Sequence, residues 1–160
     1  MKYLFIIQGE GRGHLTQAMT MEKLLRSRGH EVVEMLVGKS ESRKLPSFFL
    51  DGVNAPVTCF ESINFVSAAA DKRPDAVKSV LYNIAVSPKF IPSVSLIRSK
   101  IKESGADVIL NFYELLGTIA HGLTGRRVPM ACIGHQFLFL HEDMHIPEFG
   151  YEGHHALNLF

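Results

Sequence analysis

The sequence contains no tryptophan, only two cysteines and no excess of either charge, since 17 Lys and Arg stand against 16 Asp and Glu. A balanced charge gives no field that would draw the chain to a polyanion, so we expect no nucleic-acid partner. Long apolar runs are also missing, and no stretch approaches the roughly 20 apolar residues of a membrane-spanning helix. The short apolar start lacks the basic region and cleavage site of a secretory signal.

The two cysteines, Cys59 and Cys132, show no CxxC spacing and fall in apolar, strand-like runs. This pattern predicts reduced thiols in the core of a cytoplasmic protein and argues against cysteine as a metal ligand. Histidines gather near the C-terminus, where His141 and His145 stand four residues apart. A proline and a glycine close by argue against a regular helix there, so we predict an incidental cluster and no metal site.

With 160 residues, 46% of them hydrophobic, the chain has the size of one domain with one core. The predicted strands are Tyr3–Ile7, Glu31–Val37, Val57–Phe60, Asp107–Leu110 and Met130–Ile133. The predicted helices are one that ends at Gly29, a short one within Ser40–Leu50 interrupted near Pro46, Pro74–Ala85, Pro88–Ser104 and Leu115–Leu123. Strands that alternate with helices predict a doubly wound, mostly parallel α/β sheet of the Rossmann-like class.

The first β-α-β unit has the clearest local pattern. The continuous apolar run Leu4–Ile7 favours a strand that is covered on both faces, as in a parallel sheet. Gly29 stands where a left-handed helix cap is usual. The apolar residues of the helix between them recur at three- and four-residue spacing and predict one buried face, which comprises Ala18, Met21, Leu24 and Leu25.

The strand and the helix are joined by Gly9-Glu10-Gly11-Arg12-Gly13-His14. Glycines at alternate positions let backbone amides approach a ligand, and the helix that follows offers a positive dipole end. The segment therefore predicts a loop that meets a phosphorylated ligand. A tight turn without a ligand is the alternative.

Two common phosphate-loop motifs fit poorly. In the dinucleotide fingerprint G-x-G-x-x-G the third glycine would stand at His14, and the second strand leads to Gly38-Lys39 instead of the acid that would bind a ribose. Gly38-Lys39-Ser40 imitates the end of a Walker A loop, but Val33 occupies the position of its first glycine. A nicotinamide-binding domain and a non-catalytic nucleotide or glycan-phosphate binding module stay open as alternatives.

Two stretches carry a family resemblance. The segment from Gly9 to Ala18, continued by Leu24-Leu25 and by Arg28 to Val32, resembles the N-terminal domain of GT-B glycosyltransferases. The similar groups include the N-acetylglucosaminyltransferase of peptidoglycan lipid synthesis and allied bacterial and archaeal members. Further on, Gly105–Leu110 resembles the family's "pDvVi" strand, and the stretch from Arg127 to Gln136 resembles its "giPvi…nQ" segment. Where many members carry an acid after the fourth strand, this chain has Asn111, with Glu114 three residues on.

The resemblance implies a two-domain enzyme that transfers a sugar from a nucleotide-sugar donor to an acceptor hydroxyl. This chain, 1–160, would be the acceptor-side half, and a C-terminal half outside it would bind the donor. The apolar last residues, Ala156–Phe160, likewise indicate part of a longer protein. By resemblance the transfer is inverting and needs neither metal nor cofactor. The acceptor would be a glycan, a lipid-linked sugar or a small molecule.

His14 is the predicted catalytic residue, because a group with a near-neutral pKa at the glycine loop could take the acceptor proton or position the acceptor. Its alternative role is to cap the helix. The predicted substrate-binding residues are Gly11, Arg12, Gly13, Asn111, Glu114, His135 and Gln136. The last four follow strands at the carboxyl edge of the sheet, where ligands of open α/β folds bind. Helix caps and solvated loop residues are the alternative for them.

An apolar triplet, Phe48-Phe49-Leu50, lies close to Arg43 and Lys44. It predicts either core packing or peripheral contact with the inner face of a membrane that presents a lipid-linked acceptor.

Overall fold

The computed structural model describes residues 1–63 and 87–134. Its strands are β1 (Lys2–Gln8), β2 (Glu31–Lys39), β3 (Val57–Glu61), β4 (Val108–Phe112) and β5 (Met130–Cys132). Its helices are α1 (Arg12–Ser27), α2 (Ser47–Gly52), the short 3-10 helix η1 (Ser87–Phe90), α4 (Ile91–Glu103) and α5 (Leu115–Leu123). The predicted helix over Pro74–Ala85 lies outside the described residues.

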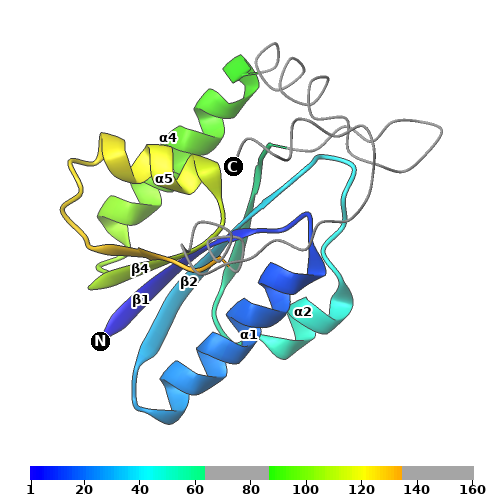
Figure 1. The fold of residues 1–160 in the computed structure, drawn as a ribbon, viewed down its shortest axis with the longest axis vertical. Helices are drawn as coiled ribbons and strands as arrows, with labels where there is room; N and C mark the ends of the chain where they lie inside the picture. Colours follow the sequence, from blue (N-terminus) through cyan, green and yellow to red (C-terminus); the bar gives the residue numbers. More distant parts are fainter. Residues whose placement is uncertain (64–86, 135–160) are drawn as a thin grey trace, which may run out of the picture.

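The five strands form one parallel sheet in the order β3-β2-β1-β4-β5. Helices α1 and α2 lie against one face of this sheet, and α4 and α5 lie against the other (Figure 1). The chain leaves β1 toward β2 on one side and later returns to place β4 on the other side of β1. The predicted α/β class and Rossmann-like parallel sheet are therefore confirmed, and the switch point of the topology falls between β1 and β4.

The central strand carries the core on both of its faces. Leu4, Phe5, Ile6 and Ile7 are fully buried, as the continuous apolar run predicts. Phe5 and Ile7 belong to the core under α1 and α2, and Leu4 and Ile6 belong to the core under α4 and α5. Gly117 of α5 sits directly on Ile6, so this helix approaches the sheet closely.

The predicted buried face of α1 is partly wrong. Leu24 has 41% of its surface exposed, whereas Glu22 is fully buried. The Glu22 carboxylate accepts hydrogen bonds of 2.8–3.1 Å from the backbone N–H groups of Asn54 and Ala55, at the turn before β3. Three accepted bonds offset the loss of solvation that a buried charge would otherwise suffer. Gly29 caps the end of α1 with a φ of 75°, as predicted.

Other expectations also need correction. Helix α2 begins only after Pro46, and Ser40 to Leu45 are not helical. Neither cysteine belongs to the core, because Cys59 and Cys132 are both exposed free thiols. They lie on β3 and β5, the edge strands of the described sheet, which the described helices cover less well than β1. Among the described helices, none has the length and apolar character needed to cross a bilayer.

Candidate functional site

A cavity of about 830 Å³ opens at the carboxyl edge of the sheet. Its described lining residues are Gln8, Glu10, Gly11, His14, Ser62, Ile63, Asn111, Tyr113, Glu114, Leu115, Thr118 and Cys132. These residues come from the ends of β1, β3, β4 and β5 and from the first turns of α1 and α5. The cavity therefore occupies the switch point of the sheet, the place where open α/β folds bind ligands.

The β1–α1 connection is shorter than predicted, because α1 already begins at Arg12. Gly9 is the glycine that the packing requires, since its N–H donates to the Gly38 carbonyl at 2.7 Å and a Cβ there would collide with that oxygen. A Cβ on Gly11 or Gly13 would meet nothing within 4 Å, and neither residue has a positive φ. Neither backbone conformation nor packing therefore requires glycine at these two positions, although the space beside them is open to a ligand.

Gly11 is the N-cap of α1 and offers no side chain to the orphan amides of the first turn. Such amides, with the helix dipole behind them, favour an anion.

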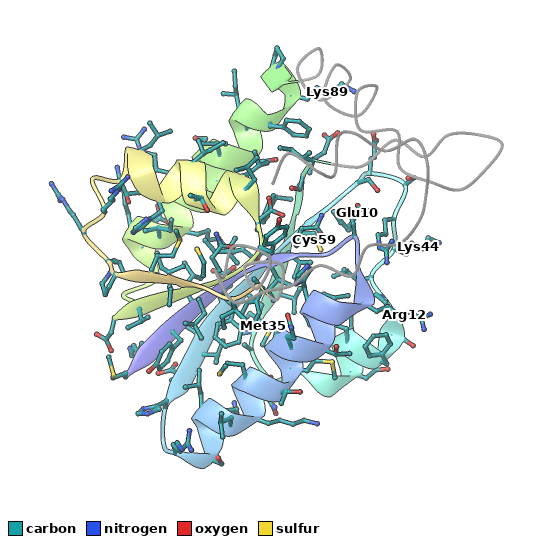
Figure 2. All side chains as sticks on the ribbon, viewed as in Figure 1. Glu10, Arg12, Met35, Lys44, Cys59 and Lys89 are labelled. Atoms are coloured by element: carbon teal, nitrogen blue, oxygen red, sulfur yellow. The ribbon has the colours of Figure 1, made fainter. Side chains whose placement is uncertain are left out.

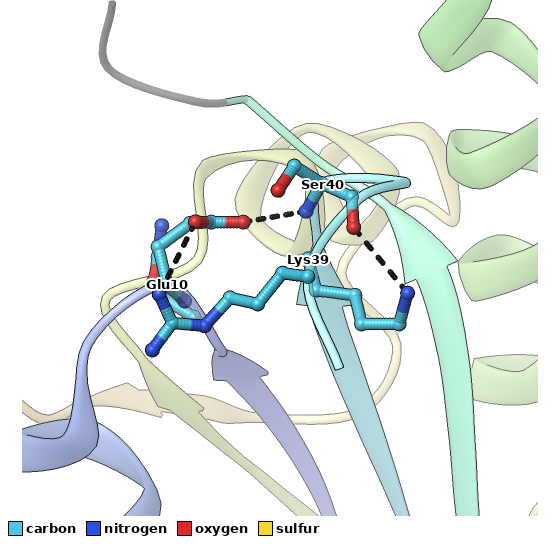
Figure 3. A network of polar contacts seen from close by, with 5 residues as sticks. Glu10, Lys39 and Ser40 are labelled. Atoms are coloured by element: carbon cyan, nitrogen blue, oxygen red, sulfur yellow. Dashed lines mark hydrogen bonds and ion pairs between the residues drawn. The ribbon is translucent and has the colours of Figure 1, made fainter. Parts of the chain in front are cut away.

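The carboxylate of the neighbouring Glu10 has its partners at and after the end of β2. Its carboxylate accepts the Ser40 N–H at 2.5 Å and lies 3.7 Å from the Arg43 guanidinium, while the Lys39 ammonium donates to the Ser40 carbonyl (Figure 3). Glu10 thus joins the end of β1 to the end of β2.

His14 lies in the first turn of α1 and lines the cavity, with 9% of its surface exposed. Its ring stacks on that of Tyr113, with 5.7 Å between the ring centroids and 15° between the planes. The Nδ1 atom lies 3.4 Å from the Gln17 amide oxygen. A protonated Nδ1 in this contact leaves the lone pair of the neutral imidazole on Nε2, the form that a general base requires.

The β4–α5 connection is a two-residue turn with an unusual backbone. Asn111 lies within β4 and not after it as predicted, and its side-chain oxygen accepts the Glu114 N–H at 2.8 Å. Its side-chain nitrogen donates to the Glu114 carbonyl at 2.9 Å and to the Thr118 hydroxyl at 3.0 Å. Tyr113, between them, has a φ of 61°, in the left-handed region that a bulky residue seldom adopts.

Glu114 is the N-cap of α5 and is almost completely buried. Its Oε1 accepts the Ser62 hydroxyl at 2.7 Å and the Leu116 N–H at 3.1 Å. Its Oε2 has no hydrogen-bond partner among the described residues and faces Gly38, where a Cβ would collide with it. Burial raises the pKa of Glu114 to about 7, the two hydrogen bonds oppose this rise, and the Glu10 charge adds to it.

Arg12, a predicted substrate-binding residue, is directed away from the cavity. It does not belong to the described lining, and neither does Gly13. The Arg12 guanidinium lies 6.0 Å from the centre of the Phe48 ring, on the α2 side of the molecule (Figure 2). Of the apolar triplet, Phe49 is fully buried, whereas Phe48 and Leu50 are exposed. The core-packing interpretation therefore holds for one residue of the three.

Two further predicted residues, His135 and Gln136, lie outside the described residues, as does the histidine-rich segment that contains His141 and His145. Within residues 1–63 and 87–134, no three His, Cys, Asp or Glu side chains are grouped so that they could hold a metal ion. Of the predicted site residues, the structure thus brings Gly11, His14, Asn111 and Glu114 together around one cavity.

Sequence reasoning missed Ser62, and it placed Tyr113 beside Asn111 and Glu114 at the carboxyl edge of the sheet without including it among the predicted site residues. The sequence holds no signal for Ser62, which follows an edge strand without any motif and meets Glu114 only through the fold. Tyr113 had a weak signal, since it stands between two residues that commonly cap helices, Asn111 and Glu114. A tight turn at that point could have been predicted, but a left-handed tyrosine could not.

No protein-family model matches the sequence, and no curated protein is similar to it. Among solved structures, the fold is similar to part of the glycotransferase of kitacinnamycin, with a TM-score of 0.51 and 16% identity, over 82% of this chain and 29% of that one. It is also similar to the C-terminal domain of a hydrogenase from Pyrococcus furiosus, with a TM-score of 0.49 and 14% identity, over 82% and 89% of the two chains. This chain spans less than a third of the glycotransferase, and the likeness shows a shared Rossmann-like fold.

Proposed function

We propose that this chain is the acceptor-side half of a GT-B glycosyltransferase, which transfers a sugar from a nucleotide-sugar donor to an acceptor hydroxyl. The observation that carries the proposal is the position of His14. An ionisable ring in the first turn of α1 lines a cavity at the switch point, beside the N-cap Gly11. The similarity of the fold to part of a glycosyltransferase is consistent with this proposal but shows the fold alone.

In the proposed reaction, His14 takes the proton of the acceptor hydroxyl while that oxygen attacks the anomeric carbon of the donor. The new glycosidic bond forms as the bond from the anomeric carbon to the diphosphate breaks, and the nucleoside diphosphate leaves with the electron pair. The first-turn amides of α1, which the N-cap Gly11 cannot bond through a side chain, would stabilise the negative charge that develops on the leaving group. A second α/β half would bind the nucleotide.

The test is a transfer assay on the full-length protein with a panel of nucleotide sugars and of glycan, lipid-linked and small-molecule acceptors. His14→Ala should lower kcat by about a hundredfold or more, the range of a lost general base, and leave Tm nearly unchanged. His14→Gln, which keeps a polar side chain but has no base, is the matched control and should be equally impaired. Wild-type turnover in either variant would exclude the catalytic role.

A non-catalytic nucleotide or glycan-phosphate binding module is the second candidate. This candidate is favoured by the open space beside Gly11 and Gly13, where a ligand could bind without reacting. Binding of a nucleotide sugar without turnover, across the whole acceptor panel and with the full-length protein, would favour this candidate over the transferase.

A further inference from the structure

Tyr113 adopts a backbone conformation that its own side chain disfavours. A φ of 61° is disfavoured for an ordinary L-residue, and glycine or asparagine would occupy the same turn at lower cost. The turn needs no side chain that reaches into the core, because Tyr113 is 44% exposed. A strained, half-exposed aromatic residue at the carboxyl edge of a parallel sheet calls for a reason beyond folding.

The neighbours of Tyr113 hold it in this conformation from both sides. Asn111 bonds both the N–H and the carbonyl of Glu114, which fixes the residue after Tyr113 to the end of β4. The Glu114 carboxyl in turn bonds the Leu116 N–H and the Ser62 hydroxyl, so the start of α5 is fixed to the segment after β3. The turn cannot relax without breaking several of these bonds.

The consequence of this fixed turn is the ring stack. The phenol of Tyr113 lies nearly parallel to the imidazole of His14, at 15°, with 5.7 Å between centroids. His14 belongs to the first turn of α1 and Tyr113 to the β4–α5 connection, so the stack joins the two sides of the switch point at the cavity. The Nδ1 atom of His14 also lies 3.4 Å from the Gln17 amide oxygen, which is long for a hydrogen bond.

We infer that Tyr113 is a positioning residue, held in a strained turn so that its ring fixes the orientation of the His14 imidazole at the cavity. The inference rests on the proposed function only for its kinetic consequence, because the orientation of the ring is a property of this chain alone. When the base is already fixed before the acceptor binds, less of the acceptor's binding free energy is used to order the base.

The first test is independent of activity. Proton NMR of the His14 ring, assigned by its loss in His14→Gln, should show an upfield ring-current shift in the wild type. Tyr113→Phe keeps the ring and should keep that shift. Tyr113→Asn accommodates the left-handed backbone but has no ring, so it should lose the shift while Tm stays equal or rises. An unchanged His14 signal in Tyr113→Asn would overturn the inference.

The second test uses the full-length protein in the transfer assay. Tyr113→Asn should lower kcat by about tenfold to a hundredfold with little change in the donor KM, because a misplaced base impairs the chemical step more than binding. Tyr113→Phe should restore wild-type kcat. Equal kcat in all three proteins would refute the positioning role even where the NMR shift is lost. Absence of any transfer by the wild type would instead count against the proposed function, and the NMR result would still decide the role of Tyr113.

Discussion

Glu114 is a carboxyl group whose surroundings favour its neutral form. Its Oε1 is bonded by Ser62 and Leu116, but its buried Oε2 has no partner among the described residues, and the Glu10 carboxylate adds unfavourable charge. Because the folded-state pKa is about 7, above the usual value of 4.5, the folded protein keeps a proton that the unfolded chain has already released between these two values. The contribution of Glu114 to the free energy of unfolding is therefore most favourable below pH 4.5 and falls as the pH rises toward 7.

A Glu114→Gln variant tests this sign. The amide imitates the protonated carboxyl and cannot ionise, so its stability should lack this pH dependence. A pKa shift of this size corresponds to a loss of about 3 kcal/mol in the free energy of unfolding once Glu114 is fully ionised. A smaller loss is expected because the structure relaxes around a buried charge. Urea unfolding at pH 5 and pH 8 should show the wild type losing more stability than the variant over that interval. Equal losses would contradict a neutral Glu114.

Also at the scale of the residue, four of the predicted site residues, Gly11, His14, Asn111 and Glu114, line the cavity, whereas Arg12 and Gly13 do not. Glu114 was predicted at the carboxyl edge of the sheet and His14 at the glycine loop, and both line the cavity because parallel strands end at one edge of the sheet. The sequence alone does not distinguish Arg12 from the residues that line the cavity. Its direction depends on where α1 begins, and at that start the Arg12 side chain lies over Phe48.

At the scale of the element, the end of β2 is a crowded junction of the site. A Cβ on Gly38 would collide with Phe60 and Ser62 from the β3 side and with Glu114, the N-cap of α5. The carbonyl of Gly38 also accepts the Gly9 N–H. The absence of a side chain at Gly38 therefore allows β1, β2, β3 and α5 to meet.

Gly38→Ala should lower the free energy of unfolding by about 1–3 kcal/mol, as expected when a methyl group enters a packed junction. Gly13→Ala is the matched control. It lies in the first turn of α1 with open space around its Cα, and alanine there should stabilise the helix by about 0.5–1 kcal/mol. Denaturant unfolding of the two variants should therefore give changes of opposite sign. A Gly38→Ala protein as stable as the wild type would show that the junction is looser than the structure indicates.

Elements with strong periodicity were predictable, and those that depend on tertiary partners were not. The bounds of α5 agree with the prediction at both ends, because its apolar residues and its cap residue Glu114 are local signals. The buried face of α1 was misassigned at Leu24 and Glu22. No local pattern shows that the turn at Asn54 and Ala55, about thirty residues along the chain, supplies the amides that let Glu22 be buried.

At the scale of the whole molecule, the proposed function assigns acceptor binding to this chain and donor binding to a second half. In the described part of the cavity no lysine or arginine lines the wall, and two carboxyl groups, those of Glu10 and Glu114, do. This lining suits an uncharged hydroxyl compound better than a diphosphate. The residues that bind the nucleotide would then belong to the donor-side half, which the proposed function places outside this chain.

Calorimetric titration of the 160-residue chain tests this division. The orphan amides of α1 and the helix dipole contribute on the order of 1–2 kcal/mol toward a diphosphate, less than the cost of immobilising the ligand. Neither nucleotide sugars nor NAD should therefore bind more tightly than about millimolar, whereas the full-length protein should bind a nucleotide sugar at micromolar concentration. Micromolar NAD binding by the chain alone would establish the nicotinamide alternative. Micromolar nucleotide-sugar binding by the chain alone would place the donor site in this half, and the acceptor would then have to bind elsewhere.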